Sequence, residues 1–163
     1  MTVAEAMKKM ILFSNGNQHD INHFLKVHAY AATIGACEGL PEDTLQTLEL
    51  AAIVHDIACP LCREKYGNTN GSYQQLEGAP LTRDFFAGTD IPADQLERIV
   101  WLVAHHHTLR PIEGPDHQIL TEADYLVNAE ESNLPESNIR HMNDAIFKTR
   151  TGKELLESVY LSH

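Results

Sequence analysis

The feature that most constrains the fold is an apolar run that ends in a His-Asp pair. The run covers residues 48–54, LELAAIV, and is followed at once by His55 and Asp56. Such a run belongs in a hydrophobic core, and a helix would carry the two polar side chains to the edge of that core. A buried imidazole and a buried carboxylate are costly unless each has a partner. The imidazole and the carboxylate can be partners of one another through a hydrogen bond, or both can bind the same divalent cation.

Helical patterning continues through the rest of the chain. Apolar residues recur at helical spacing, and capping residues, prolines and glycines separate the segments. The segments predicted to be helical are residues 2–13, 18–38, 41–56, 73–87, 92–107, 117–131, 135–146 and 153–160. Residues 59–72 are predicted to form a loop with one short turn, and no segment alternates as a strand does. We therefore expect an all-α single domain over residues 1–163, with a motif-bearing core at about 18–130 and C-terminal helices at 135–160.

Composition narrows the range of partners. The chain has 12 Lys and Arg against 23 Asp and Glu, for a formal net charge of -11. Binding to a phosphate backbone depends on Lys and Arg, so we expect no nucleic-acid partner. The first residues carry charges at Glu5, Lys8 and Lys9 and lack a long apolar core, so we expect a cytoplasmic protein without a membrane partner. Self-association into a homo-oligomer is left open.

The cysteines and histidines supply the candidate ligands. Three cysteines in a chain of this type predict free thiols, and the single CxxC of Cys59 and Cys62 is weak evidence for zinc. The helix predicted at 92–107 ends in three consecutive histidines, of which His106 and His107 continue its buried stripe best. Histidines without a supporting pattern are predicted to lie on the surface; these are His117, His141 and His163.

The ordered set of polar motifs resembles the HD-domain superfamily of metal-dependent phosphohydrolases. The pieces are D-x-x-H-x-x-x-V, a His-Asp pair after an apolar helix and an aspartate in a late helix, carried by Asp20, His23, Val27, His55, Asp56 and Asp124. The resemblance spans roughly residues 18–130 and implies a helical bundle of the HD type. It also implies that His23, His55, Asp56 and Asp124 are the ligands of one divalent metal. This ligand set suits Fe, Mn, Co, Ni or Zn and leaves positions open on a six-coordinate ion.

The function implied by the resemblance is hydrolysis of a nucleotide or another small phosphorylated metabolite. A water activated by the metal would be the nucleophile, and Asp56 would stay bridged to both metal and water. His106 and His107 are the candidates for binding phosphate oxygens and protonating the leaving group, with an exposed helix end as the alternative. Lys65 is the preferred phosphate-binding cation because it follows the His-Asp pair closely. Glu77 is the candidate to accept a hydrogen bond from a ligand histidine.

Two other functions stay open. Relatives with two metals resemble one another in a histidine shortly before a helical glycine, and here the residue four before Gly78 is Gln74, which disfavours a dinuclear centre. A di-iron oxygenase of the same fold would need two redox-active irons per chain. A non-catalytic, metal-dependent binding module would bind the ion without turnover. The metal content per chain would distinguish a di-iron oxygenase from a hydrolase. A test for turnover would distinguish a binding module from a hydrolase.

Overall fold

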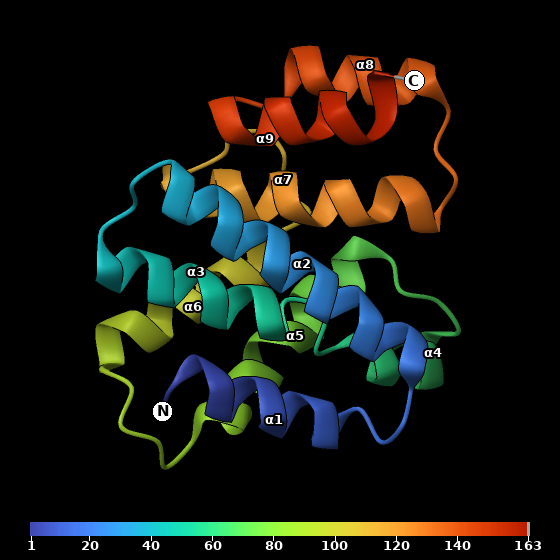
Figure 1. The fold of residues 1–163 in the computed structure, drawn as a ribbon. Coiled ribbons are helices and arrows are strands. Elements are labelled where there is room, and N and C mark those ends of the chain that lie inside the picture. Colours follow the sequence, from blue (N-terminus) through green and yellow to red (C-terminus); the bar gives the residue numbers. More distant parts are fainter. Residues whose placement is uncertain (163) are drawn as a thin grey trace.

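The computed structural model describes residues 1–162, and all regular structure within them is helical, which confirms the all-α prediction (Figure 1). The elements are α1 (Val3–Phe13), α2 (Gln18–Cys37), α3 (Glu42–Val54), α4 (Cys59–Tyr66), α5 (Gly71–Phe86), α6 (Ala93–His105), α7 (Gly114–Glu131), α8 (Glu136–Ala145), α9 (Arg150–Leu156) and the π-helical turn η1 (Glu157–Leu161).

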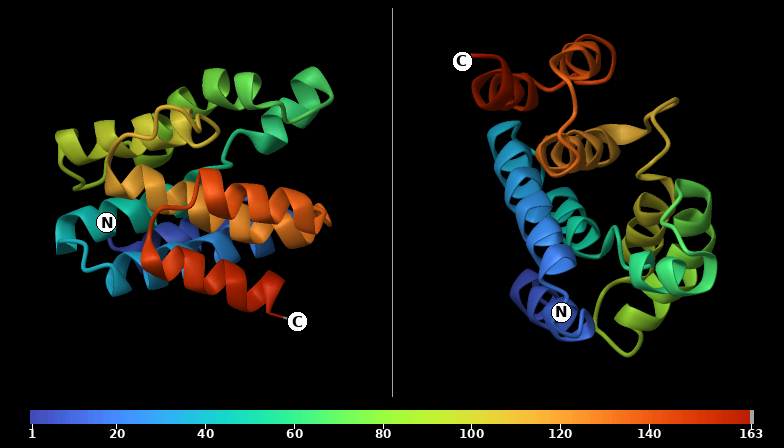
Figure 2. Two further views of the ribbon diagram at one scale, coloured as in Figure 1. Left: turned by 90° about the horizontal axis from the view of Figure 1, so that it is seen from above. Right: turned by 90° about the vertical axis from the view of Figure 1, so that its right-hand side faces the viewer.

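Helix α3 is the centre of the molecule. Its second half is fully buried, from Leu50 to Val54, and it packs against α1, α2, α6 and α7. The right-hand view of Figure 2 shows α1, α2 and α3 on one side, α4, α5 and α6 on the other side, and α7 between these two groups. Helices α8 and α9 lie outside α7 in both figures. The apolar run therefore forms the middle of the core, and its polar end faces the opposite group of helices.

One segment of the described chain is long and apolar enough to cross a membrane by length and composition. It is Glu42–Tyr66, whose most apolar window has a mean hydropathy of 1.3. Of that window, 67% is buried inside the protein. The apolar residues of this segment pack inside the protein, as those of a core helix do.

The prediction of a loop at residues 59–72 is wrong over its first half, which forms α4. Pro60 lies in the first turn of this helix, where a proline needs no hydrogen bond and does not disturb the backbone. The helix ends at Gly67, which adopts the left-handed conformation with φ 73°. The residues that favour a loop therefore begin after α4, and α5 starts at Gly71, two residues earlier than predicted.

Candidate metal centre

His55 and His106 occupy equivalent positions at the C-terminal ends of two helices. His55 caps α3 and its Nδ1 donates to the carbonyl of Ala52 at 2.7 Å. His106 caps α6 and its Nδ1 donates to the carbonyl of Val103 at 2.7 Å. The last carbonyls of a helix lack partners within the helix, so each ring satisfies one of them. A neutral ring that donates from Nδ1 carries its lone pair on Nε2, which is left free for the site.

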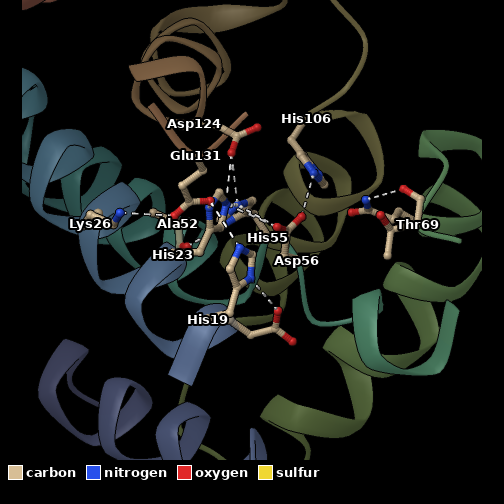
Figure 3. Close-up of polar contacts among 12 residues, drawn as sticks. His19, His23, Lys26, Ala52, His55, Asp56, Thr69, His106, Asp124 and Glu131 are labelled. Carbon is tan, nitrogen blue, oxygen red and sulfur yellow. Dashed lines mark hydrogen bonds and ion pairs between the residues drawn. The ribbon is translucent and has the colours of Figure 1, made fainter. Parts of the chain in front are cut away.

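His23 on α2 and Asp124 on α7 complete the cluster (Figure 3). The Nε2 atom of His23 lies 3.1 Å from Nε2 of His55 and 3.2 Å from both Asp56 Oδ2 and Asp124 Oδ1. The same two oxygens lie 3.5 Å and 3.4 Å from His55 Nε2. All four residues that the resemblance implies as ligands are thus brought together from α2, the end of α3 and α7.

Glu131 orients the His23 ring, although it was not among the sequence-predicted site residues. Its Oε2 accepts a hydrogen bond from His23 Nδ1 at 2.8 Å, and Lys26 Nζ lies 3.2 Å from its Oε1. A carboxylate in this position fixes the tautomer of a ligand histidine. Its spacing from Asp124 could have indicated this role, since residues seven apart, or two helical turns, lie on the same face of a helix. Glu77, the predicted acceptor, instead contacts Lys65 and Tyr66.

The donor atoms present fit a divalent cation. When His23 and His55 are neutral, two lone pairs face each other across 3.1 Å, which repels unless a proton or a cation lies between them. The Oδ1 atom of Asp124 is buried and has no hydrogen-bond partner among the described residues, although the Nε2 atoms of His23 and His55 lie 3.2 Å and 3.4 Å from it. Ligands held about 2.1 Å from one ion, at angles of 90° to 109°, lie about 3.0–3.4 Å apart, close to the separations found here. The C-terminal ends of α3 and α6 add partial negative charge.

The charges of the cluster favour a bound positive charge. Burial lowers the pKa of His23, but the carboxylates of Asp124 and Asp56, each 3.2 Å from its Nε2, outweigh burial and raise this pKa to about 11. Burial raises the pKa of both carboxyls, but the neighbouring imidazoles hold the pKa of Asp56 and of Asp124 well below the usual range. The metal-free site therefore keeps a proton on His23 at neutral pH, in the position that a cation would take.

Asp56, His106 and His107 form a second group whose ligand atoms could hold an ion. The buried Nε2 of His106 has no hydrogen-bond partner within residues 1–162 and lies 3.3 Å from Asp56 Oδ1. Asp56 therefore faces His23 through one oxygen and His106 through the other. Partial burial of its ring and the neighbouring His106 lower the pKa of His107 to about 4, so this imidazole is neutral at pH 7. The structure places both histidines beside Asp56, and their catalytic role stays a prediction.

A cavity of about 270 Å³ adjoins the cluster. Arg63 on α4 is the one lysine or arginine among its described lining residues, and it forms an ion pair with Asp20. Lys65, the predicted phosphate-binding residue, does not line this cavity and pairs with Glu77 at 2.6 Å. Gln74 lines the cavity as well, and its buried Oε1 has no hydrogen-bond partner among residues 1–162. The cation that the structure offers to a ligand here is thus Arg63.

A comparison of the sequence with protein families gives a match that covers the four predicted metal ligands of the cluster. The family described as HD domain matches residues 20–129, which include every member of the cluster except Glu131. The chain belongs to the HD domain family. Proteins of this family are for the most part metal-dependent phosphohydrolases. Neither the curated proteins nor the solved structures include a significant match to the sequence.

His117 is buried in this HD domain, so the prediction that it lies on the surface is wrong. Its Nε2 donates to the carbonyl of His105 at 3.0 Å, and its Nδ1 accepts from the backbone N–H of Glu113 at 3.0 Å. The ring also packs edge-on against Trp101. Helix α7 starts three residues before His117, which turns the ring toward the end of α6. His141 is exposed as predicted, and His163 lies outside the described residues.

Proposed function

We propose that this HD domain is a metal-dependent hydrolase of a nucleotide or another small phosphorylated metabolite. The observation that carries the proposal is the convergence of two imidazoles and two carboxylates beside a cavity that presents an arginine. His23, His55, Asp56 and Asp124 would hold a divalent ion, of Fe, Mn, Co, Ni or Zn. A bound ion of this kind supplies Lewis acidity and lowers the pKa of a coordinated water. The net charge of -11 favours a small substrate over a polymeric anion.

The residues around the ion would bind and orient the phosphoryl group. The planar guanidinium of Arg63 can bind two phosphate oxygens at once, and its ion pair with Asp20 holds it at the cavity wall. Asp56 accepts hydrogen bonds and orients the attacking water. His106 gives a proton to the leaving oxygen, because Asp56 outweighs the effect of burial and raises the pKa of this imidazole, whereas the neutral His107 binds the substrate. Lys65 remains a candidate only for a substrate that extends beyond the cavity.

A screen of phosphorylated metabolites with each of the five metals tests the proposal. Phosphate release should depend on an added ion and stop on chelation. The double variant His106→Gln/His107→Gln should keep the ion of the first group and lose turnover by about 10²–10⁴-fold. His141→Gln, on an exposed face of α8, is the matched control and should leave turnover unchanged.

Metal content measured on the same variants separates the alternatives. No phosphate release with any of the metals would contradict the proposal and favour a binding module. If wild type held two ions and the double variant lost one, the group of Asp56, His106 and His107 would be a second metal site. Two irons and oxygen consumption would then support the oxygenase alternative.

A further inference from the structure

A second cavity, of about 160 Å³, adjoins the metal centre on its other side. It lies between the end of α6, one face of α7 and Met142 of α8. Helix α7 lines it with Thr121, Asp124 and Asn128, which lie three to seven residues apart and so share a face. Asp124 and Asn128 also line the 270 Å³ cavity. The two cavities therefore meet at the predicted ligand Asp124.

The two cavities differ in chemistry. The larger one presents the cation Arg63, whereas the described lining of the smaller one contains no lysine or arginine and has apolar surface from Leu109 and Met142. Its polar groups include the Thr121 hydroxyl, which is buried and has no hydrogen-bond partner in the part of the chain that the structure describes. Thr121 is only 3% exposed. An unpartnered buried hydroxyl is costly, so the Thr121 oxygen is available to an oxygen or nitrogen atom of a bound group.

We propose that the smaller cavity is the subsite for the leaving group and limits it to about a single six-membered ring. This inference rests on the proposed phosphohydrolase function. An enclosed cavity of about 150 Å³ holds one benzene molecule. The cavity here opens to solvent beside the exposed His107 and Leu109, so its walls surround about one ring and leave part of a fused two-ring group outside them. The substrate class is therefore a small phosphate monoester, such as a sugar phosphate, and not a nucleotide whose leaving group is an entire nucleoside.

The reaction in this arrangement is a balanced hydrolysis. The oxygen of a water forms a bond to phosphorus, and the bond between phosphorus and the leaving oxygen breaks. The proton that the water loses is released to solvent. The leaving oxygen receives a proton from His106, which borders the smaller cavity and then takes up a proton from solvent. The products are inorganic phosphate and an alcohol that occupies the smaller cavity.

Two esters that differ only in the leaving group test the size limit. Phenyl phosphate carries one ring and 1-naphthyl phosphate carries two. Wild type should have a kcat/KM for phenyl phosphate at least about tenfold above that for the naphthyl ester. Met142→Ala enlarges the cavity and should raise the relative kcat/KM of the naphthyl ester by about tenfold. Ile139→Ala, on the same helix but outside the cavity lining, is the control and should leave the ratio unchanged.

The ratio is measured on one preparation, so any loss of folded protein in a variant cancels. Equal kcat/KM values for the two esters, unchanged in Met142→Ala, would overturn the subsite and leave the hydrolase function standing. Absence of turnover with both esters would instead count against the proposed function. In that case calorimetric binding of phenylphosphonate and 1-naphthylphosphonate to the metal-loaded protein decides the subsite. A clear preference for the phenyl compound supports it, and equal affinities overturn it.

Discussion

The three buried imidazoles of the metal centre are all held through Nδ1, which leaves Nε2 free to bind. His55 and His106 use backbone carbonyls at the ends of α3 and α6, whereas His23 uses the carboxylate of Glu131. The position of a backbone carbonyl acceptor is set by the helix to which it belongs, so the orientation of His55 and His106 needs no other side chain. The orientation of His23 alone therefore depends on another side chain, and that dependence can be tested.

Glu131→Gln should weaken binding of a divalent metal by about 10–100-fold, because the amide no longer favours the tautomer that binds through Nε2. Titration calorimetry with Co²⁺ or Zn²⁺ measures the change. The adjacent Glu130→Gln is the matched control, since Glu130 contacts Lys26 as Glu131 does but does not contact His23. Equal losses in the two variants would show that general charge near the site, and not ring orientation, sets the affinity.

Metal binding at pH 7.5 should release about one proton, since the pKa of His23 is raised to about 11 in the metal-free protein. The apparent affinity should accordingly rise with pH. In the metal-free protein, this raised pKa adds stability that is fully present below pH 6.5 and is lost as the pH rises toward 11. Calorimetry in buffers of different ionisation enthalpy counts the protons. A binding enthalpy that does not vary with the buffer would contradict this assignment.

Among the elements, α9 depends on a single buried carboxylate of α7. Glu122 is fully buried, and its Oε1 accepts from the backbone N–H groups of Lys148 and Thr149 at 2.7 Å and 3.0 Å. Thr149 in turn caps α9 by accepting from the N–H of Gly152. A Cβ atom on Gly152 would lie 2.0 Å from Glu122 Oε2, so only glycine permits this approach. These contacts explain why α9 begins at Arg150, earlier than the predicted start at residue 153.

Glu122→Ala should lower the free energy of unfolding by about 2–4 kcal/mol, because it leaves two backbone N–H groups without an acceptor. For a chain of this length the melting temperature should fall by roughly 5–15 °C. Glu136→Ala, which removes an exposed ion pair with Arg140 on α8, is the control and should cost no more than about 1 kcal/mol. Similar shifts in the two variants would rule out the anchoring role of Glu122. Calorimetric melting curves measure both.

Across the whole molecule, the metal centre joins segments that are distant in the sequence. His23 and Asp124 are brought together from α2 and α7, which pack against each other along the central α3. The ends of α3 and α6 reach the same place from the core and from the opposite group of helices (Figure 3). An ion bound there would crosslink the bundle and would bind the folded chain alone.

Added divalent metal should therefore raise the melting temperature, by an amount that grows with metal concentration. At 100 times the dissociation constant, the gain is about 2.7 kcal/mol in the free energy of unfolding. Chelation should remove it. In Asp124→Asn the shift should be reduced or absent, whereas His141→Gln should retain it. An unchanged shift in Asp124→Asn would show that Asp124 is not a ligand.

The sequence by itself determined every helix except α4, and it determined the polar end of the core. Thr2 and Glu5 form a capping box at the start of α1, because such pairs lie within one turn and need no tertiary contact. The apolar residues of the run before His55 are all buried, since their composition leaves them no other stable place. The family motif could also be recognised from the sequence, because each of its pieces follows or lies within an apolar helical pattern.

The tertiary structure alone decided which side chains meet across those helices. It placed Glu131 on His23, turned Arg63 and not Lys65 toward the cavity, and buried His117 against α6. Each of these depends on the rotation and offset of one helix against another. These are set by the packing of many side chains at once, so the pattern within a single segment does not contain them.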